Sequence, residues 1–330
     1  MNYTVTEYAR DVVWGILTAC NEEGIKHPDI ISESGRAIVA HHAVLVTEVT
    51  DVSPVPEAVP QLDRPPTNHD LLQELYSLYE ELNVKNCHEV FHDTLSLRDE
   101  ALQRFNQGDL SLVERAYADR VCKQLLSKIE QVASNLKHVP EDLARLGEAL
   151  RDMYFCNFSV FQSLPDLWAV DQLFPVMPIH RLDTEPTRRA IIADLTCDSD
   201  GKIERFIDSK EVKRYIKLHE LRPGEPYYLG LFLVGAYQEI LGDLHNLFGD
   251  TNAVHIDLNE EGEPEIVSVI EGDTVREVLS YVQFDAQDLV ERLRCAIEKA
   301  LRAGKLTDEE SAQLQRRFRE GLEGYTYLVV

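Results

Sequence analysis

The sequence predicts an α+β protein with several domains, because helical and strand-like periodicities occupy separate parts of the chain. Residues 68–158 contain almost no glycine and are rich in Leu, Glu, Gln and Arg, which favour helices. Two sets of apolar residues recur there at helical spacing: Leu71, Leu75, Leu78 and Leu82, then Val113, Tyr117, Val121 and Leu125. We therefore expect a helical-bundle insertion at 68–158, in which Pro140 opens a third helix.

The residues before this insertion are expected to form a helix, a short strand, a longer strand and an extended connection. Thr4 and Glu7 have the spacing of a capping box, which predicts a helix over residues 4–20. The apolar residues at 29–32 predict a short buried strand, and the Val- and Thr-rich residues 43–52 predict a longer one. Helix, short loop and strand in this order are typical of the end of an α/β unit.

Strand-like runs return after the insertion, at 190–195, 228–233, 253–258 and 265–269. Helical spacing resumes after residue 285, and Thr307 with Glu310 forms a second capping box. The expected order is therefore an α/β remnant at 1–43, a strand and linker at 44–67, the helical insertion at 68–158, a β-domain at 159–284 and a helical domain at 285–330.

The charge of the chain excludes some classes of partner. Its 330 residues carry 33 Lys and Arg against 58 Asp and Glu, a formal net charge of −25. So acidic a protein is not expected to bind nucleic acid or anionic lipid, whereas it would attract a small cationic substrate. No run approaches the roughly 20 apolar residues of a membrane-spanning helix. The N-terminal residues also lack the basic region of a signal peptide, so we expect no membrane contact.

Six cysteines lie far apart and form no CxxC pair: Cys20, Cys87, Cys122, Cys156, Cys197 and Cys295. This spacing argues against a zinc ribbon and against a dense disulfide framework. Free thiols are typical of a reducing compartment, so the cysteine pattern predicts a cytoplasmic protein.

Residues 88–92 match the pattern H-E-x-x-H. On a helix, His88 and His92 would share a face and could hold zinc, with Glu89 as the base of a hydrolase. The pattern fixes only three positions, and no third ligand is evident in the sequence. Between a zinc hydrolase and an exposed or interfacial helix, we expect the helix and no metal.

A candidate phosphate-binding segment follows the strand predicted at 29–32. In β/α barrels the carboxyl ends of the strands carry the chemistry. Gly35 would let the backbone approach a ligand closely, and Arg36 offers a guanidinium fork for phosphate. Glu33 would place a carboxylate where it could meet a positively charged ring nitrogen. A solvated helix cap is the alternative.

Gly235 and Tyr237 follow a strongly apolar run. A glycine in such a place often marks close approach of the backbone to a ligand, and a tyrosine hydroxyl requires a polar partner. Ordinary packing is the alternative, and the spacing alone favours it.

Cys197 lies among acids, in the sequence TCDSDG at 196–201. Asp198 and Asp200 would disfavour a thiolate by repulsion between like charges, so we expect a protonated thiol. Such a thiol is a poor nucleophile and a serviceable acid. The alternative is a cysteine at a strand end that is followed by an acidic turn without chemical function.

Together these segments resemble the biosynthetic arginine decarboxylase family, over essentially the whole chain. The resemblance rests on ESGR at 33–36 with AIVAHHAVLV after it, on the blocks at 159–190 and 219–250, on TCDSDG and on LEGYTYL near the end. The wider group comprises pyridoxal-phosphate decarboxylases with an alanine-racemase-like barrel and a β-domain, among them ornithine and diaminopimelate decarboxylases.

The resemblance implies a fold and an activity. Residues 1–43 would be the last βα unit of a TIM-type barrel that binds pyridoxal 5'-phosphate, and the antiparallel β-domain would be similar to the C-terminal domain of alanine racemase. The intact enzyme would convert L-arginine into agmatine and carbon dioxide for polyamine biosynthesis. The family also suggests Mg²⁺ as a further cofactor.

The resemblance implies roles for residues on the cofactor side. Glu33 would pair with the pyridine nitrogen and keep it protonated, so that the ring is an electron sink. Gly35, Arg36 and Tyr237 would bind the phosphate. The family commonly has proline where Ser34 stands, a change that we expect to be tolerated.

On the substrate side, Cys197 would protonate the α-carbon after carbon dioxide leaves. Asp198 would receive the guanidinium of arginine, with help from Asp200. In the family, this cysteine and aspartate reach into the barrel of the partner subunit. The resemblance therefore implies a dimer with shared active sites, or a larger oligomer such as a tetramer.

The sequence departs from the family where the cofactor is attached. The family's Schiff-base lysine and glycine-rich phosphate loop lie in earlier barrel strands, and no lysine here (for example Lys26, Lys202 or Lys217) is in a matching motif. The sequence thus resembles the C-terminal part of the enzyme and is expected to be inactive alone. Two hypotheses stay open: the chain complements a separate N-terminal barrel half, or it caps a barrel-bearing homologue as a non-catalytic regulator.

Overall fold

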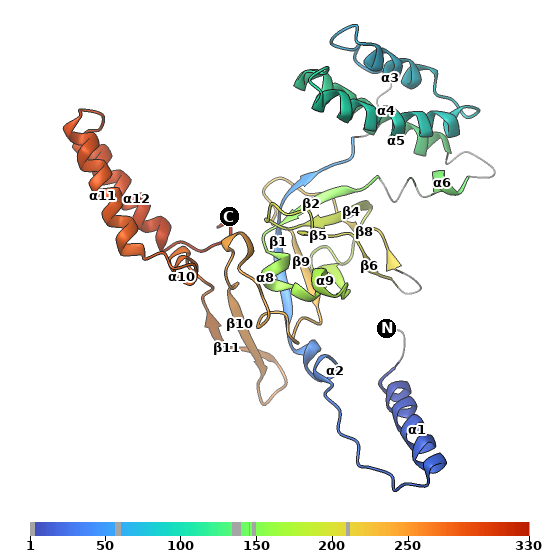
Figure 1. The fold of residues 1–330 in the computed structure, drawn as a ribbon, viewed down its shortest axis with the longest axis vertical. Helices are drawn as coiled ribbons and strands as arrows, with labels where there is room; N and C mark the ends of the chain where they lie inside the picture. Colours follow the sequence, from blue (N-terminus) through green and yellow to red (C-terminus); the bar gives the residue numbers. More distant parts are fainter. Residues whose placement is uncertain are drawn as a thin grey trace. The chain divides into compact units, whose positions relative to one another are not determined.

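The computed structural model describes residues 4–56, 61–133, 140–144, 146, 150–208 and 212–329 (Figure 1). They form two compact units, each assembled from segments that are distant in the sequence. The first unit contains Met1–Val46, Ser159–Pro175 and Gly230–Val330, and the second contains Thr47–Phe158 and Val176–Leu229.

A mixed sheet has the strand order β3-β9-β1-β2-β4-β5, in which β8 also pairs with β4. β2 is antiparallel to β1 and parallel to β4, with Asp152 opposite Ala190 and Phe155 opposite Ala193. β6 and β7 form a separate pair. The strands are β1 (Val44–Ser53), β2 (Asp152–Cys156), β3 (Val176–Pro178), β4 (Arg188–Ala193), β5 (Lys202–Ile203), β6 (Phe206–Ile207), β7 (Val212–Lys213), β8 (Ile216–Leu218) and β9 (Tyr228–Phe232).

Burial along these strands follows their position in the sheet. In β2 the side chains of Asp152, Tyr154 and Cys156 are buried and alternate with partly exposed ones. β4 ends in four successive buried residues, as expected for a strand that is covered on both faces. The strands predicted at 43–52, 190–195 and 228–233 are therefore confirmed as β1, β4 and β9.

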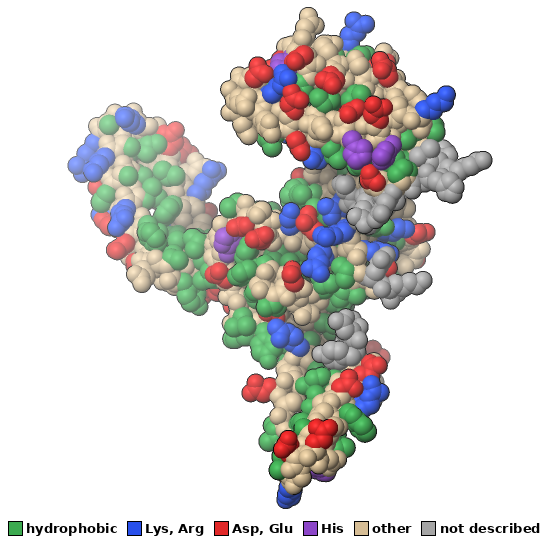
Figure 2. All heavy atoms as spheres, turned by 45° about the vertical axis from the view of Figure 1, so that its right-hand side comes forward, with side chains coloured by type: hydrophobic (Ala, Val, Ile, Leu, Met, Phe, Trp, Pro, Cys, Tyr) green, Lys and Arg blue, Asp and Glu red, His purple; other side chains and the backbone are tan. Residues whose placement is uncertain are grey.

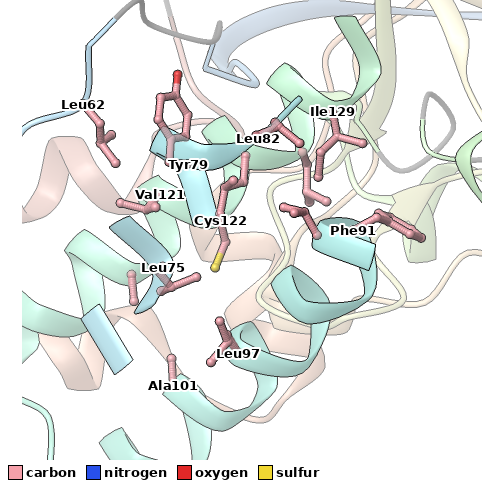
Figure 3. Close-up of a cluster of buried hydrophobic side chains, with 14 of the residues drawn as sticks. Leu62, Leu75, Tyr79, Leu82, Phe91, Leu97, Ala101, Val121, Cys122 and Ile129 are labelled. Carbon is pink, nitrogen blue, oxygen red and sulfur yellow. The ribbon is translucent and has the colours of Figure 1, made fainter. Parts of the chain in front are cut away.

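A helical bundle lies between β1 and β2 in the chain (Figure 1). Its helices are α3 (Asp70–Glu81), α4 (Cys87–Asn106), α5 (Leu112–Ala133) and the short α6 (Glu141–Ala144), which directly follows Pro140. Figure 3 shows the side chains of Leu75, Leu97 and Val121 in the shared apolar core, one from each of the three long helices. The bundle is thus held together by burial of apolar stripes.

The predicted stripes are confirmed with one exception. Leu71, Leu75 and Leu82 are buried, and so are the last three members of the α5 stripe, whereas Val113 is 67% exposed. Because Leu112 is also exposed, the first turn of α5 lies outside the apolar core. The helical stretch also ends earlier than predicted, since β2 begins at Asp152.

The first unit begins with α1 (Val5–Glu23), where the expected capping box forms in both directions. The Thr4 amide donates to a Glu7 carboxylate oxygen at 2.6 Å, and the Glu7 amide donates to the Thr4 hydroxyl at 3.2 Å. The helix ends at Gly24, which has a left-handed conformation (φ +63°) that suits glycine. The predicted helix is therefore confirmed. Further along, α2 (Gly35–Val39) and the 3-10 turn η1 (Ala40–His42) lead into β1.

The buried strand predicted at 29–32 is wrong. These residues have no regular secondary structure, and Ile31 is 96% exposed. A strand requires a neighbour for its backbone hydrogen bonds and for the burial of its side chains. No strand among the described residues pairs with this segment.

The rest of the first unit combines short helices, a hairpin and a C-terminal helical region. These elements are α8 (Val160–Ser163), α9 (Pro165–Ala169), η2 (His245–Leu247), β10 (Ala253–Leu258), β11 (Pro264–Ile270), α10 (Val275–Tyr281), α11 (Ala286–Arg302) and α12 (Asp308–Leu322). The strands at 253–258 and 265–269 and the capping box at Thr307 are confirmed. α10 is an additional helix, and its signal in the sequence is the capping box of Thr274 and Glu277. None of the described helices is both long and apolar enough to cross a bilayer.

The β10–β11 hairpin exposes apolar side chains on both of its strands. The exposed members are Val254, Ile256, Leu258, Ile266, Val267, Val269 and Ile270. A two-stranded hairpin without a buried face is marginal in water, and apolar patches of this kind are typical of interaction surfaces.

The bundle core gives a direct test of stability. We expect Leu75→Ala to lower the free energy of unfolding by about 2–5 kcal/mol, because the substitution leaves a cavity among buried side chains. Leu102→Ala on α4 is the matched control: Leu102 is 48% exposed, against 0% for Leu75. The control should change the free energy by no more than about 0.5 kcal/mol. Urea titration of the full chain, followed by far-ultraviolet circular dichroism, measures both, and equal effects would contradict the assigned core.

The start of α5 gives a pH-dependent test. Glu114 accepts hydrogen bonds from the Thr67 hydroxyl (2.6 Å) and from the Ser111 hydroxyl (2.7 Å) and amide (2.8 Å), and these bonds lower its pKa from 4.5 to about 2. A lowered folded-state pKa stabilises the fold above the unfolded pKa, and this contribution is lost as the pH falls toward 2. We therefore expect Glu114→Gln to lower the melting temperature at pH 7 by an amount that shrinks steadily below about pH 4.5. Thermal unfolding from pH 7 downward checks this, and a difference that is constant with pH would refute it.

Candidate functional site

In the first unit, Arg36 is held by a largely buried carboxylate. Its Nη2 atom lies 2.5 Å from Oδ2 of Asp166, which sits in the first turn of α9 directly after Pro165. Half of the Arg36 side chain is exposed, whereas only a tenth of the Asp166 side chain is. Asp166 therefore holds one side of the guanidinium in place, and the exposed side remains accessible to an anion.

Asp166 is itself oriented by Gln238, which is buried. The Gln238 amide nitrogen donates to Oδ2 of Asp166 at 2.7 Å, and its carbonyl oxygen accepts from the Asp166 backbone amide at 3.2 Å. The same amide nitrogen also donates to the carbonyl of Ala236 at 2.9 Å. A chain of hydrogen bonds thus runs from the buried Gln238 through Asp166 to Arg36.

Tyr237 completes this group of residues. The Arg36 guanidinium lies over its ring, 4.8 Å from the centroid. A Cβ atom added to Gly35 would lie 2.4 Å from the Tyr237 hydroxyl oxygen, so only glycine allows this approach. The structure therefore brings Tyr237 against Gly35 and Arg36, which precede it by about 200 positions in the sequence.

Gly235 is also closely approached by other atoms, and these belong to the segment at the end of α2. Its amide donates to the carbonyl of Ala40 at 2.9 Å, and an added Cβ would overlap the carbonyl of Val39 and the ring of His42. This contact fastens the segment before Tyr237 to the end of α2. Of the alternatives for Gly235, packing is the one that the structure favours.

Glu33 lies exposed in the irregular segment just before α2. Its neighbours Ser32 and Ser34 have their hydroxyl oxygens 3.1 Å apart. The described contacts do not join Glu33 to Arg36 or Tyr237.

In the second unit, residues 194–201 form the loop of the β4–β5 hairpin, and a buried aspartate organises it. Oδ1 of Asp194 accepts hydrogen bonds from the amide and the hydroxyl of Thr196, at 2.8 and 2.7 Å. The Asp194 amide donates to the carbonyl of Gly201 at 2.9 Å, and Gly201 in turn donates to the carbonyl of Asp198 at 3.1 Å. An added Cβ at Gly201 would lie 2.3 Å from both Asp194 and Thr196, so glycine is required here.

This loop presents Cys197, Asp198 and Asp200 to solvent. The Asp200 amide donates to Oδ1 of Asp198 at 3.2 Å, which fixes one carboxylate oxygen of Asp198 within the loop. The loop follows the carboxyl end of β4, beside the end of the parallel strand β2, and the Leu195 amide donates to the carbonyl of Phe158 at 3.1 Å. Carboxyl ends of neighbouring parallel strands are favoured places for functional side chains.

The cysteines divide into two groups. Cys197 and Cys295 are exposed, and the other four are buried and free. Burial raises the pKa of Cys122 to about 12, and burial with the nearby Asp194 raises the pKa of Cys156 as well.

Three residues of these sites were absent from the sequence-based candidates: Asp166, Gln238 and Asp194. Asp166 and Gln238 carry only weak signals, since each acts by a contact with a residue more than 70 positions away. Asp194 follows an apolar run directly, and an acid at a strand end before a Gly-containing turn is a signal that could have found it.

Comparison with known proteins identifies two segments. Residues 65–147 match the arginine decarboxylase helical bundle domain, and residues 275–328 match the arginine decarboxylase C-terminal helical extension. Biosynthetic arginine decarboxylase of Bacteroides thetaiotaomicron is 48% identical over 99% of the chain, and that of Thermosynechococcus vestitus is 51% identical over 99%. The chain is similar to biosynthetic arginine decarboxylases over nearly its whole length. It spans about half the length of these curated relatives, 52% and 51% respectively.

A solved arginine decarboxylase has the same fold. The crystal structure of the biosynthetic arginine decarboxylase of Campylobacter jejuni matches 99% of this chain with a TM-score of 0.76 and 34% identity, and the match covers 52% of that structure. The α+β fold with a helical bundle is therefore similar to that of about half of this solved arginine decarboxylase.

Thiol labelling tests the exposure of Cys197. Iodoacetamide should alkylate Cys197 and Cys295 in the folded chain, because the reagent can reach their sulfur atoms, and the four buried cysteines only after denaturation. Peptide mass spectrometry at successive times resolves all six. Fast labelling of Cys156 in the folded chain would contradict the packing of β2 and β4.

Proposed function

We propose that this chain supplies part of the active site of a pyridoxal-phosphate-dependent arginine decarboxylase, which converts L-arginine into agmatine and carbon dioxide in polyamine biosynthesis. The observation that carries the proposal is the group formed by Gly35, Arg36 and Tyr237. This group contains a guanidinium, a hydroxyl and a glycine backbone without a side chain in the way. Groups of this kind can donate hydrogen bonds to the oxygens of a phosphate monoester.

These donors fit the cofactor phosphate. Arg36 would bind phosphate oxygens with the part of its guanidinium that faces away from Asp166, and Tyr237 would donate its hydroxyl. Gly35 would leave room for the phosphate beside the backbone. Glu33 would accept a hydrogen bond from the ring nitrogen and so keep the ring positively charged.

The residues of the β4–β5 loop would act on the substrate. When bound, pyridoxal phosphate supplies an electron sink for the electron pair that remains on the α-carbon after carbon dioxide leaves. Cys197 would transfer its thiol proton to that carbon and be left as a thiolate, which solvent reprotonates. Asp198, with Asp200, would bind the guanidinium of arginine through charge-assisted hydrogen bonds.

The finer architecture follows from this proposal. Residues 1–43 would be the last βα unit of a TIM-type barrel, and residues 44–67 and 159–284 would supply an alanine-racemase-like β-domain. In such a barrel, residues 29–32 would require neighbouring strands for their backbone hydrogen bonds, and no strand among the described residues supplies them. Residues 68–158 would be the helical insertion, and 285–330 the C-terminal helical domain.

The proposed partner is a chain that carries the barrel and the Schiff-base lysine, either a separate N-terminal half or a longer copy. Complete active sites would then be formed by residues of two subunits, within a dimer or a tetramer in the cytoplasm. The exposed apolar side chains of the β10–β11 hairpin support an assembly, because such a surface is costly in water. We assign no residue to Mg²⁺.

Complementation tests the function. The chain alone, mixed with pyridoxal phosphate and L-arginine, should yield no agmatine, and co-expression with the barrel-bearing half of a relative should yield a complex and activity. A complex without activity would favour a non-catalytic regulator, and agmatine from the chain alone would overturn the shared site.

In the active complex, Cys197→Ser should lower kcat by about 100-fold or more, because a positioned general acid contributes 10²–10⁴-fold. Cys295→Ser is the control, since Cys295 is the other exposed cysteine and lies on α11. Equal activity of the two variants would remove Cys197 from the proposed role.

A further inference from the structure

Two histidines of the helical bundle point at one carboxylate. His88 and His92 lie on α4, and Asp142 lies on α6. The Nε2 atoms of the two histidines are 3.1 and 3.2 Å from the same oxygen, Oδ2 of Asp142. Figure 2 shows histidine side chains gathered beside an acidic side chain on the surface of the bundle. This arrangement supplies the third ligand that is not evident in the sequence, because Asp142 is 50 positions beyond His92.

The sequence of α4 explains why the histidines converge. Residues four apart lie on the same face of a helix, so His88 and His92 are neighbours, and their rings are in edge contact with centroids 4.8 Å apart. Each of the three side chains is about half exposed. An ion from solvent can therefore reach them, and water can occupy the remaining coordination positions.

The spacing of the three ligand atoms suits a metal ion. All three lie within 4.8 Å of one another. Ligands placed 2.0–2.1 Å from a tetrahedral zinc ion are about 3.3 Å apart. The two nitrogen–oxygen distances are already close to this value, whereas the two imidazole nitrogens, up to 4.8 Å apart, would move toward each other on binding.

The donor set selects the kind of ion. Two imidazole nitrogens and one carboxylate oxygen favour zinc and the neighbouring transition metals, whereas Mg²⁺ prefers oxygen ligands and retains its waters. The exposed acids Glu89 and Asp93 follow the two histidines on α4 and make the surroundings more negative. Both features favour a divalent cation of the zinc type.

We propose that His88, His92 and Asp142 form a binding site for a divalent transition-metal ion, with zinc as the preferred ion. The ion would join α6 to α4. The competing state is a metal-free cluster, in which the carboxylate accepts hydrogen bonds from both imidazoles. The proposal is independent of the decarboxylase activity.

Metal titration of the full chain tests the site. With Zn²⁺ alone as the probe, calorimetry should give one site per chain that His88→Gln, His92→Gln and Asp142→Asn each weaken by more than about 10-fold, since even an indirect partner of a metal is worth 10–100-fold. Mg²⁺ should not compete. His255→Gln is the matched control, because His255 is exposed on β10, and it should leave the affinity unchanged.

Two further measurements distinguish metal binding at this site from metal binding at a cysteine thiolate or elsewhere on the surface. Co²⁺ should give visible bands of a nitrogen–oxygen site without thiolate charge transfer, and the Cys197→Ser/Cys295→Ser double variant should give the same spectrum. Zn²⁺ should also raise the melting temperature of the parent chain and not that of His92→Gln. The proposal is overturned if no zinc binds, if binding survives His88→Gln and Asp142→Asn, or if the bands are those of a thiolate site.

Discussion

An ion pair between a buried aspartate and a partly exposed arginine links neighbouring strands of the second unit. Asp152 at the start of β2 receives two hydrogen bonds from Arg188 at the start of β4, at 2.6 and 2.9 Å, and a third from the backbone amide of Val55 at 2.7 Å. The pair therefore joins two parallel strands and the segment that follows β1. A bidentate guanidinium–carboxylate contact of this kind fixes orientation as well as distance, and removing one partner would leave a buried charge.

This arrangement explains how the chain accommodates a large helical insertion. The bundle occupies the connection between β1 and β2, which are paired with each other in the sheet, so its two ends leave from neighbouring strands. The bundle has its own apolar core, and Glu130 on α5 also forms an ion pair with Arg189 on β4. On the other side of β2, β4 carries the loop with Cys197.

In both candidate sites, a buried polar side chain positions the exposed side chains of the site. Gln238 orients Asp166, which orients Arg36, and Asp194 organises the loop that presents Cys197. A buried polar group without hydrogen-bond partners is unfavourable, so breaking the contact with its neighbour costs free energy. The neighbour is therefore kept in place. The sequence predicted the exposed members and missed the buried ones, because a buried carboxylate is recognised by its partners and those partners are distant in the chain.

The sequence by itself determined the features that depend on neighbouring residues. Capping boxes, apolar stripes and strand-like runs predicted α1, α3, α5, α12 and five of the described strands, β1, β4, β9, β10 and β11, since these signals act within a few residues. Only the tertiary structure decided the rest. The run at 29–32 has the composition of a strand and no strand beside it, and His88 and His92 gain Asp142 only when α6 returns to α4. Strand pairing and the contact of His88 and His92 with Asp142 depend on segments that are distant in the sequence. A pattern within a few residues therefore cannot predict either of them.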